Sequence, residues 1–267
     1  MAYRNLRDRH MTAQKPHRGF YLLPNAFTTG NLFAGVFAIM LAMNGRFEMA
    51  ATAIFVAMLL DGMDGRVARL TNTQSAFGEQ YDSMADMVSF GVAPALVMYS
   101  YALDSLGRVG LIATFIYVAG AALRLARFNT NIAVVDSRFF QGLPSPSAAA
   151  LLSGFVWLSA ENRIPTTDVM QWLGVLLTVY AGLTMISTAP FFSGKSMIKR
   201  KEGEAGKKPP VWLLITLVLT FAIIALDPAI MLFLLFVVYA LSGWVVFFIR
   251  WKKAKELVDI RHKEEQS

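Results

Sequence analysis

Apolar segments long enough to cross a lipid bilayer recur along this chain, and they restrict its fold more than any other feature of the sequence. The chain has 267 residues, of which 55% are hydrophobic, and its mean hydropathy is +0.48. A helix needs about 20 predominantly apolar residues to cross the hydrocarbon core of a bilayer. We therefore predict an all-α fold, a polytopic integral membrane helical bundle. Its eight predicted spans are 21–44, 48–68, 82–103, 109–128, 146–160, 168–192, 211–226 and 229–250.

Polar stretches between the spans divide the chain into parts. The first twenty residues are basic and polar without an apolar run, so we expect no cleavable secretory signal, and the first span then serves as the insertion signal. Residues 201–210 are rich in Lys, Glu, Gly and Pro, which is typical of a flexible linker. The predicted parts are an N-terminal segment 1–20, a six-helix body 21–192, a linker 193–210, a transmembrane hairpin 211–250 and a tail 251–267.

Positive charge falls on one side of the predicted bundle. If the N-terminus is cytoplasmic, 22 of the 25 lysine and arginine residues lie on the cytoplasmic side, and only Arg46, Arg108 and Arg163 lie outside. Cytoplasmic loops of membrane proteins carry such an excess of basic residues. We therefore expect a protein of the bacterial inner (cytoplasmic) membrane with both termini in the cytoplasm. The net charge of +7 then reflects topology, and nucleic acid is not an expected partner.

The composition excludes several catalytic chemistries. The chain has no cysteine, which excludes disulfides, thiolate catalysis and zinc-thiolate sites. Its three histidines, His10, His17 and His262, all lie in the predicted polar tails, which excludes histidine catalysis within the membrane. Carboxylates remain as the groups available to act as a base inside the bundle.

Four aspartates lie at or inside the ends of the second and third predicted spans. A carboxylate at the centre of a membrane helix costs about 2.5 to 3.5 kcal/mol on insertion scales, so carboxylates without a function are not expected there. Asp61 and Asp64 are three residues apart, and Asp82 and Asp86 are four apart, so each pair shares a helical face. A short polar turn between the helices would bring all four into one pocket near the cytoplasmic surface.

Small residues follow the same helical faces as these acids. Gly65 and Ala68 continue the face of Asp61, and Gly78 precedes Asp82 by four residues. Such a pocket suits one or two hard divalent cations, Mg²⁺ or Mn²⁺, while the glycines leave space for a ligand near the backbone. The alternative interpretation is that the small residues only allow close helix packing.

The spacing of these residues resembles the signature of the CDP-alcohol phosphotransferase family. The signature D-x2-D-G-x2-A-R-x8-G-x3-D-x3-D is matched at all eight fixed positions, which are Asp61, Asp64, Gly65, Ala68, Arg69, Gly78, Asp82 and Asp86. The resemblance covers the six-helix body, about 21–192. It implies a two-metal site that binds the pyrophosphate of a CDP-linked lipid, and it suggests a homodimer.

The resemblance also implies a role for individual positions. Asp61, Asp64 and Asp82 would be metal ligands, and Asp86 would approach the metal and take the proton from the acceptor alcohol. The residues that would contact or make room for the CDP-lipid are Asn25, Gly65, Ala68, Arg69, Ser75 and Gly78. Asn25 and Ser75 have a second interpretation, because polar residues at helix starts are also ordinary caps.

A separate part of the chain bears on the acceptor alcohol. Residues 122–130 and 140–146 resemble the phosphatidylserine synthase branch of the family, which implies transfer of the phosphatidyl group from CDP-diacylglycerol to L-serine. The candidate acceptor-binding residues are Arg124, Arg127 and Asn129. Two arginines three apart at the inner end of a helix can hold a carboxylate by paired hydrogen bonds. Alternatively, these arginines only set topology by reaching the membrane interface.

Two other functions are compatible with the same residues. A phosphate-bearing acceptor would also need arginines, so synthesis of phosphatidylglycerol phosphate by another family member stays open. A divalent-cation transporter could use the aspartates as an ion path. A transporter would not need the glycines and Arg69 of the signature, and an arginine beside an ion path is unfavourable.

Overall fold

The structure is a computed structural model, and it describes residues 22–130, 139–162, 164–192 and 211–265. Helices dominate these residues, which confirms the all-α polytopic fold. The α-helices are α1 (Leu22–Met43), α2 (Phe47–Thr71), α3 (Ala76–Asp86), α4 (Ala93–Met98), α5 (Arg108–Thr130), α6 (Ser145–Glu161), α7 (Asp168–Ile186), α9 (Val211–Leu226) and α10 (Pro228–Glu265). One short antiparallel pair joins β1 (Phe139–Gln141) to β2 (Pro190–Phe192). The predicted segments 1–20 and 193–210 lie outside the described residues.

Residues 76–106 form one continuous helical rod. Two π-helical segments, Met87–Val92 and Tyr99–Leu103, follow α3 and α4, and a 3₁₀ turn ends the rod at Leu106. Pro94 explains the first π segment, because proline has no N–H to donate to the carbonyl of Phe90 four residues earlier. The buried hydroxyl of Tyr117 in α5 donates to that carbonyl instead, at 3.0 Å. This contact fixes the helix immediately after Asp86.

The third helix begins six residues before its predicted start at 82. Ser75 has an extended backbone, and its side-chain oxygen accepts a hydrogen bond of 3.0 Å from the N–H of Gly78. This is an N-cap, and it lets the polar residues of the first turns join the helix. Hydropathy alone missed these turns because they are not apolar.

Two C-terminal boundaries also differ from the prediction. The sixth span was predicted to reach 192, but α7 ends at Ile186, because Ser187 is extended and Pro190 begins β2. Proline cannot continue a helix, whereas it is tolerated at the first residue of a strand. The last helix was predicted to end at 250, but α10 continues to Glu265. Residues 251–265 contain neither proline nor glycine and are rich in good helix formers.

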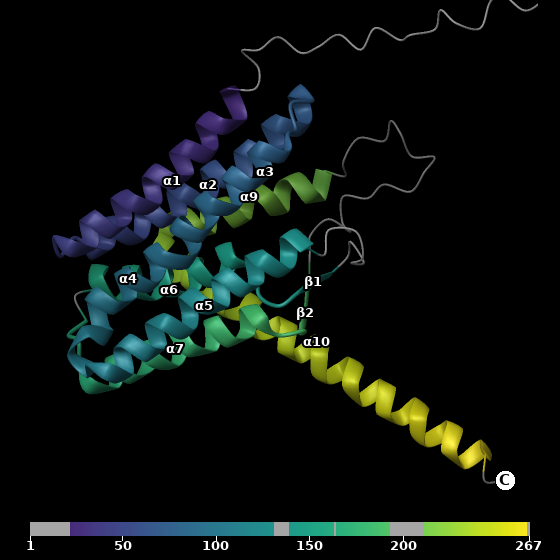
Figure 1. The fold of residues 1–267 in the computed structure, drawn as a ribbon. Helices are drawn as coiled ribbons and strands as arrows, with labels where there is room; N and C mark the ends of the chain where they lie inside the picture. Colours follow the sequence, from purple (N-terminus) through teal and green to yellow (C-terminus); the bar gives the residue numbers. More distant parts are fainter. Residues whose placement is uncertain (1–21, 131–138, 163, 193–210, 266–267) are drawn as a thin grey trace, which may run out of the picture.

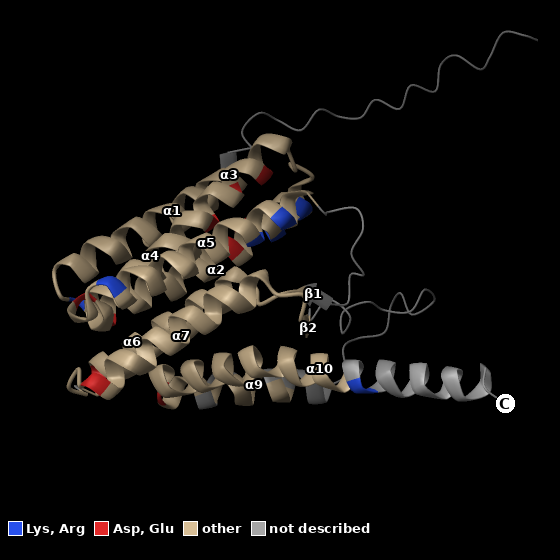
Figure 2. Ribbon diagram, turned by 60° about the horizontal axis from the view of Figure 1, so that its bottom comes forward, with Lys and Arg blue, Asp and Glu red and all other residues tan. Residues whose placement is uncertain are grey.

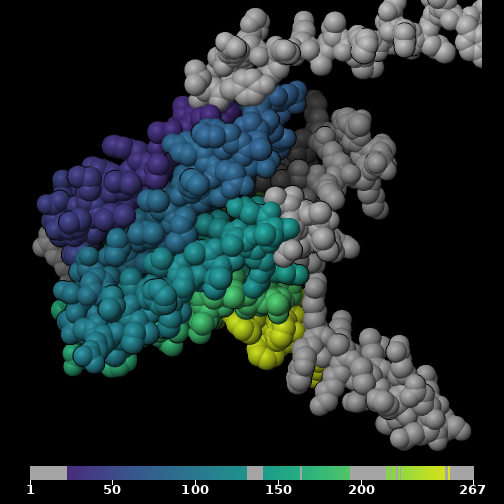
Figure 3. All heavy atoms as spheres, in the orientation of Figure 1, coloured from purple at the N-terminus to yellow at the C-terminus, as the bar shows by residue number. Residues whose placement is uncertain are grey.

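The helices pack around one central helix, α6. In Figure 1, α1, α2 and α3 form one group, and α10 extends away from the body toward the C-terminus. The surfaces of α5 and α7 adjoin in Figure 3. These two helices approach closely at Gly120, where an added Cβ would collide with the carbonyl of Gly182. α6 is the most enclosed element, and it contacts α2, α4, α7 and α10.

Apolar side chains cover the outside of this bundle. Five helices in the described residues are long and apolar enough to cross a membrane, namely Leu23–Met43, Ala76–Leu106, Arg108–Thr130, Asp168–Ile186 and Pro228–Ile249. The other three predicted spans form helices that are less apolar or shorter. α2 carries the charged residues of the signature, and α6 and α9 have only 17 and 16 residues. Charged residues gather toward the helix ends, with an uncharged band between them (Figure 2). Large side chains such as Phe33 and Phe115, each 69% exposed, point away from the core. A lipid bilayer is the environment that such a surface requires.

Candidate active site

A tight turn between α2 and α3 positions the acidic residues. α2 ends at Asn72, whose φ of 50° is left-handed, and the N–H of Thr73 bonds back to the carbonyl of Ala68 at 3.0 Å. Asparagine tolerates this backbone conformation better than most residues do. Ser75 then starts α3 as its N-cap. The turn therefore places the second half of α2 beside α3.

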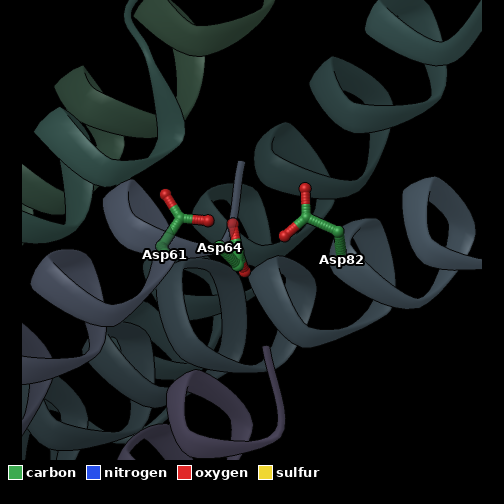
Figure 4. Close-up of side chains that lie close together, drawn as sticks. All are labelled: Asp61, Asp64 and Asp82. Carbon is green, nitrogen blue, oxygen red and sulfur yellow. The ribbon is translucent and has the colours of Figure 1, made fainter. Parts of the chain in front are cut away.

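This turn brings the four predicted acids together. One carboxylate oxygen each of Asp61, Asp64 and Asp82 lies within 4.8 Å of the others, and Asp64 is only 5% exposed. Figure 4 shows Asp64 between Asp61 and Asp82. The side chain of Asp86 lies within hydrogen-bonding distance of Asp61. Carboxylates this close repel one another unless a cation or a shared proton lies among them.

The donor set of this cluster fits a divalent cation. Thr28 donates to Asp64 at 2.9 Å and Asn31 donates to Asp86 at 3.2 Å, yet Oδ1 of Asp82 is buried without a hydrogen-bond partner in the described residues. A buried carboxylate oxygen without a donor is strongly unfavourable, and a metal ion would satisfy it. Hard oxygen ligands of this kind suit Mg²⁺ or Mn²⁺. The cluster could therefore bind a divalent metal.

A cavity of about 210 Å³ opens beside the aspartates. It is enclosed by the first half of α1, the end of α2, the following turn and the start of α3. All six residues predicted for the CDP-lipid line it, namely Asn25, Gly65, Ala68, Arg69, Ser75 and Gly78. Asp64 and Asp82 line the cavity and also belong to the acidic cluster, so the cavity and the cluster adjoin. The motif spacing therefore corresponds to one continuous pocket.

Glycines keep this cavity open. A Cβ added at Gly78 would lie 3.2 Å from Oγ of Ser75 and 3.7 Å from Oδ1 of Asn25. A Cβ added at Gly65 would lie 3.5 Å from the guanidinium of Arg69. Ser75 has both roles considered for it, since it caps α3 and also lines the cavity.

The three candidate acceptor residues lie in the last turns of α5. Arg127 donates to the carbonyls of Ile186 at 2.8 Å and Ser187 at 3.4 Å, so it caps the end of α7. Arg124 donates to the carbonyl of Gln141 in β1 at 3.3 Å. It also lies close enough to Asp86 for an electrostatic interaction. Arg124 therefore interacts electrostatically with Asp86, whereas the guanidinium of Arg127 is engaged in holding α7.

Asn129 is linked to the acidic helix rather than to the arginines. Its side-chain amide exchanges hydrogen bonds with the hydroxyl of Ser83, at 3.1 and 3.3 Å. Ser83 follows Asp82 directly in α3. The contact joins the end of α5 to the helix that carries two of the four aspartates.

Thr28 and Asn31 are site residues that the sequence prediction missed. Both lie in α1, at three and six residues from Asn25, and both bond to a signature aspartate. Their spacing places them with Asn25 along one side of the helix. A polar stripe in an otherwise apolar span was the available signal.

Known proteins place the chain in a family. The family model described as CDP-alcohol phosphatidyltransferase matches residues 21–180. The chain is also 33% identical over 237 residues to the CDP-diacylglycerol–serine O-phosphatidyltransferase of Helicobacter pylori, covering 88% of this chain and 96% of that protein. This chain belongs to the CDP-alcohol phosphatidyltransferase family. The predicted family resemblance is confirmed, and an enzyme family gives no support to the cation-transporter alternative.

Two further family relatives match shorter regions. The enzyme of the same name from Mycobacterium leprae is 38% identical over 145 residues, covering 52% of this chain and 48% of that protein. The archaetidylserine synthase of Methanothermobacter thermautotrophicus is 34% identical over 169 residues, covering 62% and 71%. Membership of a lipid-synthesising family agrees with the apolar helices, and the protein is an integral membrane protein.

Proposed function

We propose that this chain transfers the phosphatidyl group of CDP-diacylglycerol to the hydroxyl of L-serine, giving phosphatidylserine and CMP. The observation that carries the proposal is one pocket lined by six of the eight signature residues, which shares Asp64 and Asp82 with the acidic cluster. The choice of serine is supported by the similarity to the Helicobacter pylori enzyme, which extends over 96% of that protein.

The cavity between α1, α2 and α3 receives the CDP end of the lipid in this proposal. Arg69 brings positive charge to the pyrophosphate, and Gly65 and Gly78 allow it to approach the helix backbones. Asn25 and Ser75 provide polar contacts beside Gly78. The acyl chains remain among the exposed apolar side chains of the bundle, where they stay in the bilayer.

Asp61, Asp64 and Asp82, with Asp86 beside them, would hold one or two ions of Mg²⁺ or Mn²⁺. Two such ions, when bound, would neutralise the phosphate oxygens and favour an in-line displacement. Thr28 orients Asp64 through its hydrogen bond of 2.9 Å. The burial of this carboxylate limits the access of water to it.

Asp86 is the proposed proton acceptor. The serine hydroxyl oxygen attacks the phosphorus atom that carries the diacylglycerol, its proton passes to Asp86, and the bond to the CMP phosphate breaks with its electron pair on CMP. The chain has no cysteine, and its histidines lie outside the described helices or near their C-terminal end, so no obvious nucleophile is available for a covalent intermediate. The reaction is therefore a single displacement.

Arg124 and Asn129 are proposed to form the acceptor side. Arg124 interacts electrostatically with Asp86, so a serine carboxylate paired with Arg124 would bring the serine hydroxyl toward the proposed base. Arg127, which was predicted as a second partner, contributes by fixing the end of α7 behind this region. Asn129 holds the end of α5 against α3 through its hydrogen bond with Ser83.

The membrane placement is part of the same proposal. With 22 of 25 basic residues on the side of the N-terminus, the active site and both termini face the cytoplasm of a bacterial inner membrane. We also propose the division predicted from the sequence, into a catalytic body 21–192 and a C-terminal hairpin 211–250. We also propose a homodimer, on the family resemblance alone.

An acceptor panel tests the function. Purified protein with CDP-diacylglycerol and Mn²⁺ or Mg²⁺ is given L-serine, glycerol 3-phosphate or inositol, and CMP release and lipid products are measured. Serine should release CMP and yield phosphatidylserine, while the other two should give only the rate seen without acceptor. A faster reaction with glycerol 3-phosphate would instead identify a phosphatidylglycerol phosphate synthase.

A further inference from the structure

Two polar side chains of α1 each hold one signature carboxylate. Thr28 donates to Oδ2 of Asp64 in α2, and Asn31 donates to Oδ1 of Asp86 in α3. Both are almost fully buried, with exposed fractions of 3% for Thr28 and 0% for Asn31. The two carboxylates have different proposed roles, one as a metal ligand and one as a proton acceptor. The donors on α1 are therefore expected to affect different steps.

The backbone of Asn31 is fixed against the helix that follows Asp86. Its carbonyl accepts a hydrogen bond of 2.9 Å from the hydroxyl of Ser89 in the π-helical segment. One turn further along α1, Gly35 contacts Ser89 so closely that a Cβ there would collide with it. α1 and the π segment thus form a rigid junction, and Asn31 reaches Asp86 from this junction.

Burial of the Asn31 side chain would be energetically unfavourable if this residue only filled space in the core. Its Oδ1 is buried without a hydrogen-bond partner in the described residues. An unsatisfied buried polar atom costs about 1 to 3 kcal/mol, which a leucine at this position would avoid. The amide N–H must face the carboxylate, because the opposite orientation would place two acceptor oxygens together.

We propose that Asn31 is a positioning residue that orients Asp86 toward the acceptor hydroxyl. Its N–H occupies Oδ1 of Asp86 and restricts rotation of the carboxyl group, which leaves Oδ2 to receive the proton. Thr28 orients Asp64 in the proposed metal site in the same way. This inference rests on the proposed function, in which Asp86 accepts the proton of serine.

The test compares Asn31→Leu with Thr28→Val and a control, Thr178→Val. Thr178 is buried in α7, and its hydroxyl bonds only to the Gly174 carbonyl of its own helix among the described residues. For each purified variant, kcat, the KM values for CDP-diacylglycerol and serine, and the Mn²⁺ concentration for half-maximal activity are measured. Thermal unfolding in the same detergent reports on stability.

Different parameters should change in the two α1 variants. Asn31→Leu should lower kcat by about tenfold or more, since positioned proton transfer contributes about 10²- to 10⁴-fold to a reaction. Its KM for CDP-diacylglycerol and its Mn²⁺ requirement should stay within about twofold of wild type. Thr28→Val should raise the Mn²⁺ requirement severalfold and recover most of its kcat at saturating Mn²⁺. Thr178→Val should change neither kcat nor the Mn²⁺ requirement.

A double-mutant cycle shows whether Asn31 acts through Asp86. If it does, Asn31→Leu should cause little further loss of kcat in an Asp86→Asn background, because residues that act through one another are not additive. Additive losses would overturn the inference, as would a wild-type kcat in Asn31→Leu. If Asn31→Leu does not fold, Asn31→Ala replaces it in the cycle, because alanine lacks the N–H donor, adds no charge beside Asp86 and is favourable in a helix.

The same cycle separates failure of this inference from failure of the proposed function. A wild-type kcat in Asp86→Asn alone would contradict the proton-acceptor role of Asp86, and the inference would fail with it. An impaired Asp86→Asn combined with additive losses would overturn only the role of Asn31. The acceptor panel described above would be unaffected by that second result.

Discussion

The hydroxyl of Tyr239 in α10 donates a hydrogen bond of 3.1 Å to the backbone carbonyl of Phe192 in β2, 47 residues earlier in the chain. β2 pairs with β1, in which the carbonyl of Gln141 accepts a hydrogen bond from Arg124. Gly243 in α10 leaves room for the ring of Phe191 in the same strand. The last helix thus supports the strand pair that borders the proposed acceptor side.

Removing this contact should affect serine more than the lipid. Tyr239→Phe deletes a hydrogen bond worth about 1 kcal/mol, and we expect it to raise the KM for serine severalfold with little change in the KM for CDP-diacylglycerol. Tyr180→Phe is the matched control, because its hydroxyl also bonds to α10, at the Ala240 carbonyl (2.7 Å), rather than to a carbonyl of the strand pair. Equal effects of the two variants on both KM values would contradict a specific link to the acceptor side.

Two glycines of α2 allow a test of the cavity. Gly65→Ala adds a methyl group to the cavity wall without a steric clash, so it should raise the KM for CDP-diacylglycerol. Gly62→Ala adds the same group where no heavy atom lies within 4 Å, so its KM should not change. Alanine is favoured over glycine in a helix by about 1 kcal/mol, so neither variant should be less stable than wild type. A similar KM in both variants would mean that the lipid does not occupy this cavity.

The two arginines of α5 should differ when each is changed to lysine. Arg124→Lys should raise the KM for serine, because lysine cannot make the planar two-point contact with a carboxylate. Arg127→Lys should instead lower the unfolding temperature, since the paired donors that cap α7 are lost. Steady-state kinetics and thermal unfolding of both variants test whether Arg124 affects serine binding and Arg127 affects stability. The topological interpretation of Arg124 would be correct if its variant kept wild-type serine kinetics.

The stereochemical course tests the single displacement. Direct attack of serine on phosphorus inverts its configuration, whereas a phosphatidyl-enzyme intermediate requires two displacements and gives net retention. We expect inversion when CDP-diacylglycerol with a chiral, isotopically labelled phosphate is converted by the wild-type protein. Retention would require a nucleophilic side chain that the proposed mechanism does not contain.

The acidic cluster was predictable because its geometry is local. Residues three or four apart share a helical face, so the spacing of Asp61 with Asp64 and of Asp82 with Asp86 fixed both faces before the structure was known. The turn between the helices then needed only polar residues. Four of the cavity residues, Gly65, Ala68, Arg69 and Gly78, followed from their positions in the family signature. Asn25 and Ser75 followed from the wider family resemblance, and the structure gathers all six in one pocket.

Contacts between distant parts of the chain were not predictable. The bonds of Thr28 to Asp64 and of Asn31 to Asp86 join residues 36 and 55 positions apart, and no local pattern gives such pairs. The capping of α7 by Arg127 depends on how α5 crosses α7. The end of α7 was also misplaced, because hydropathy joined the apolar residues 189–192 to the helix although Pro190 is a local signal against a helix there. Their pairing with β1 depends on the fold and has no such local signal.

Incorporation of labelled serine into lipid tests the central claim most directly. Wild-type protein and Asp64→Asn are incubated with CDP-diacylglycerol and labelled L-serine, with a metal chelator and then with Mn²⁺ restored, and labelled lipid and CMP are both counted. Wild type should form labelled phosphatidylserine and CMP in equal amounts, lose both with chelator and regain both with Mn²⁺. Asp64→Asn should remain folded and lose most of this activity, because it removes a carboxylate from the centre of the cluster. Metal-independent labelling, or full activity in Asp64→Asn, would contradict the account.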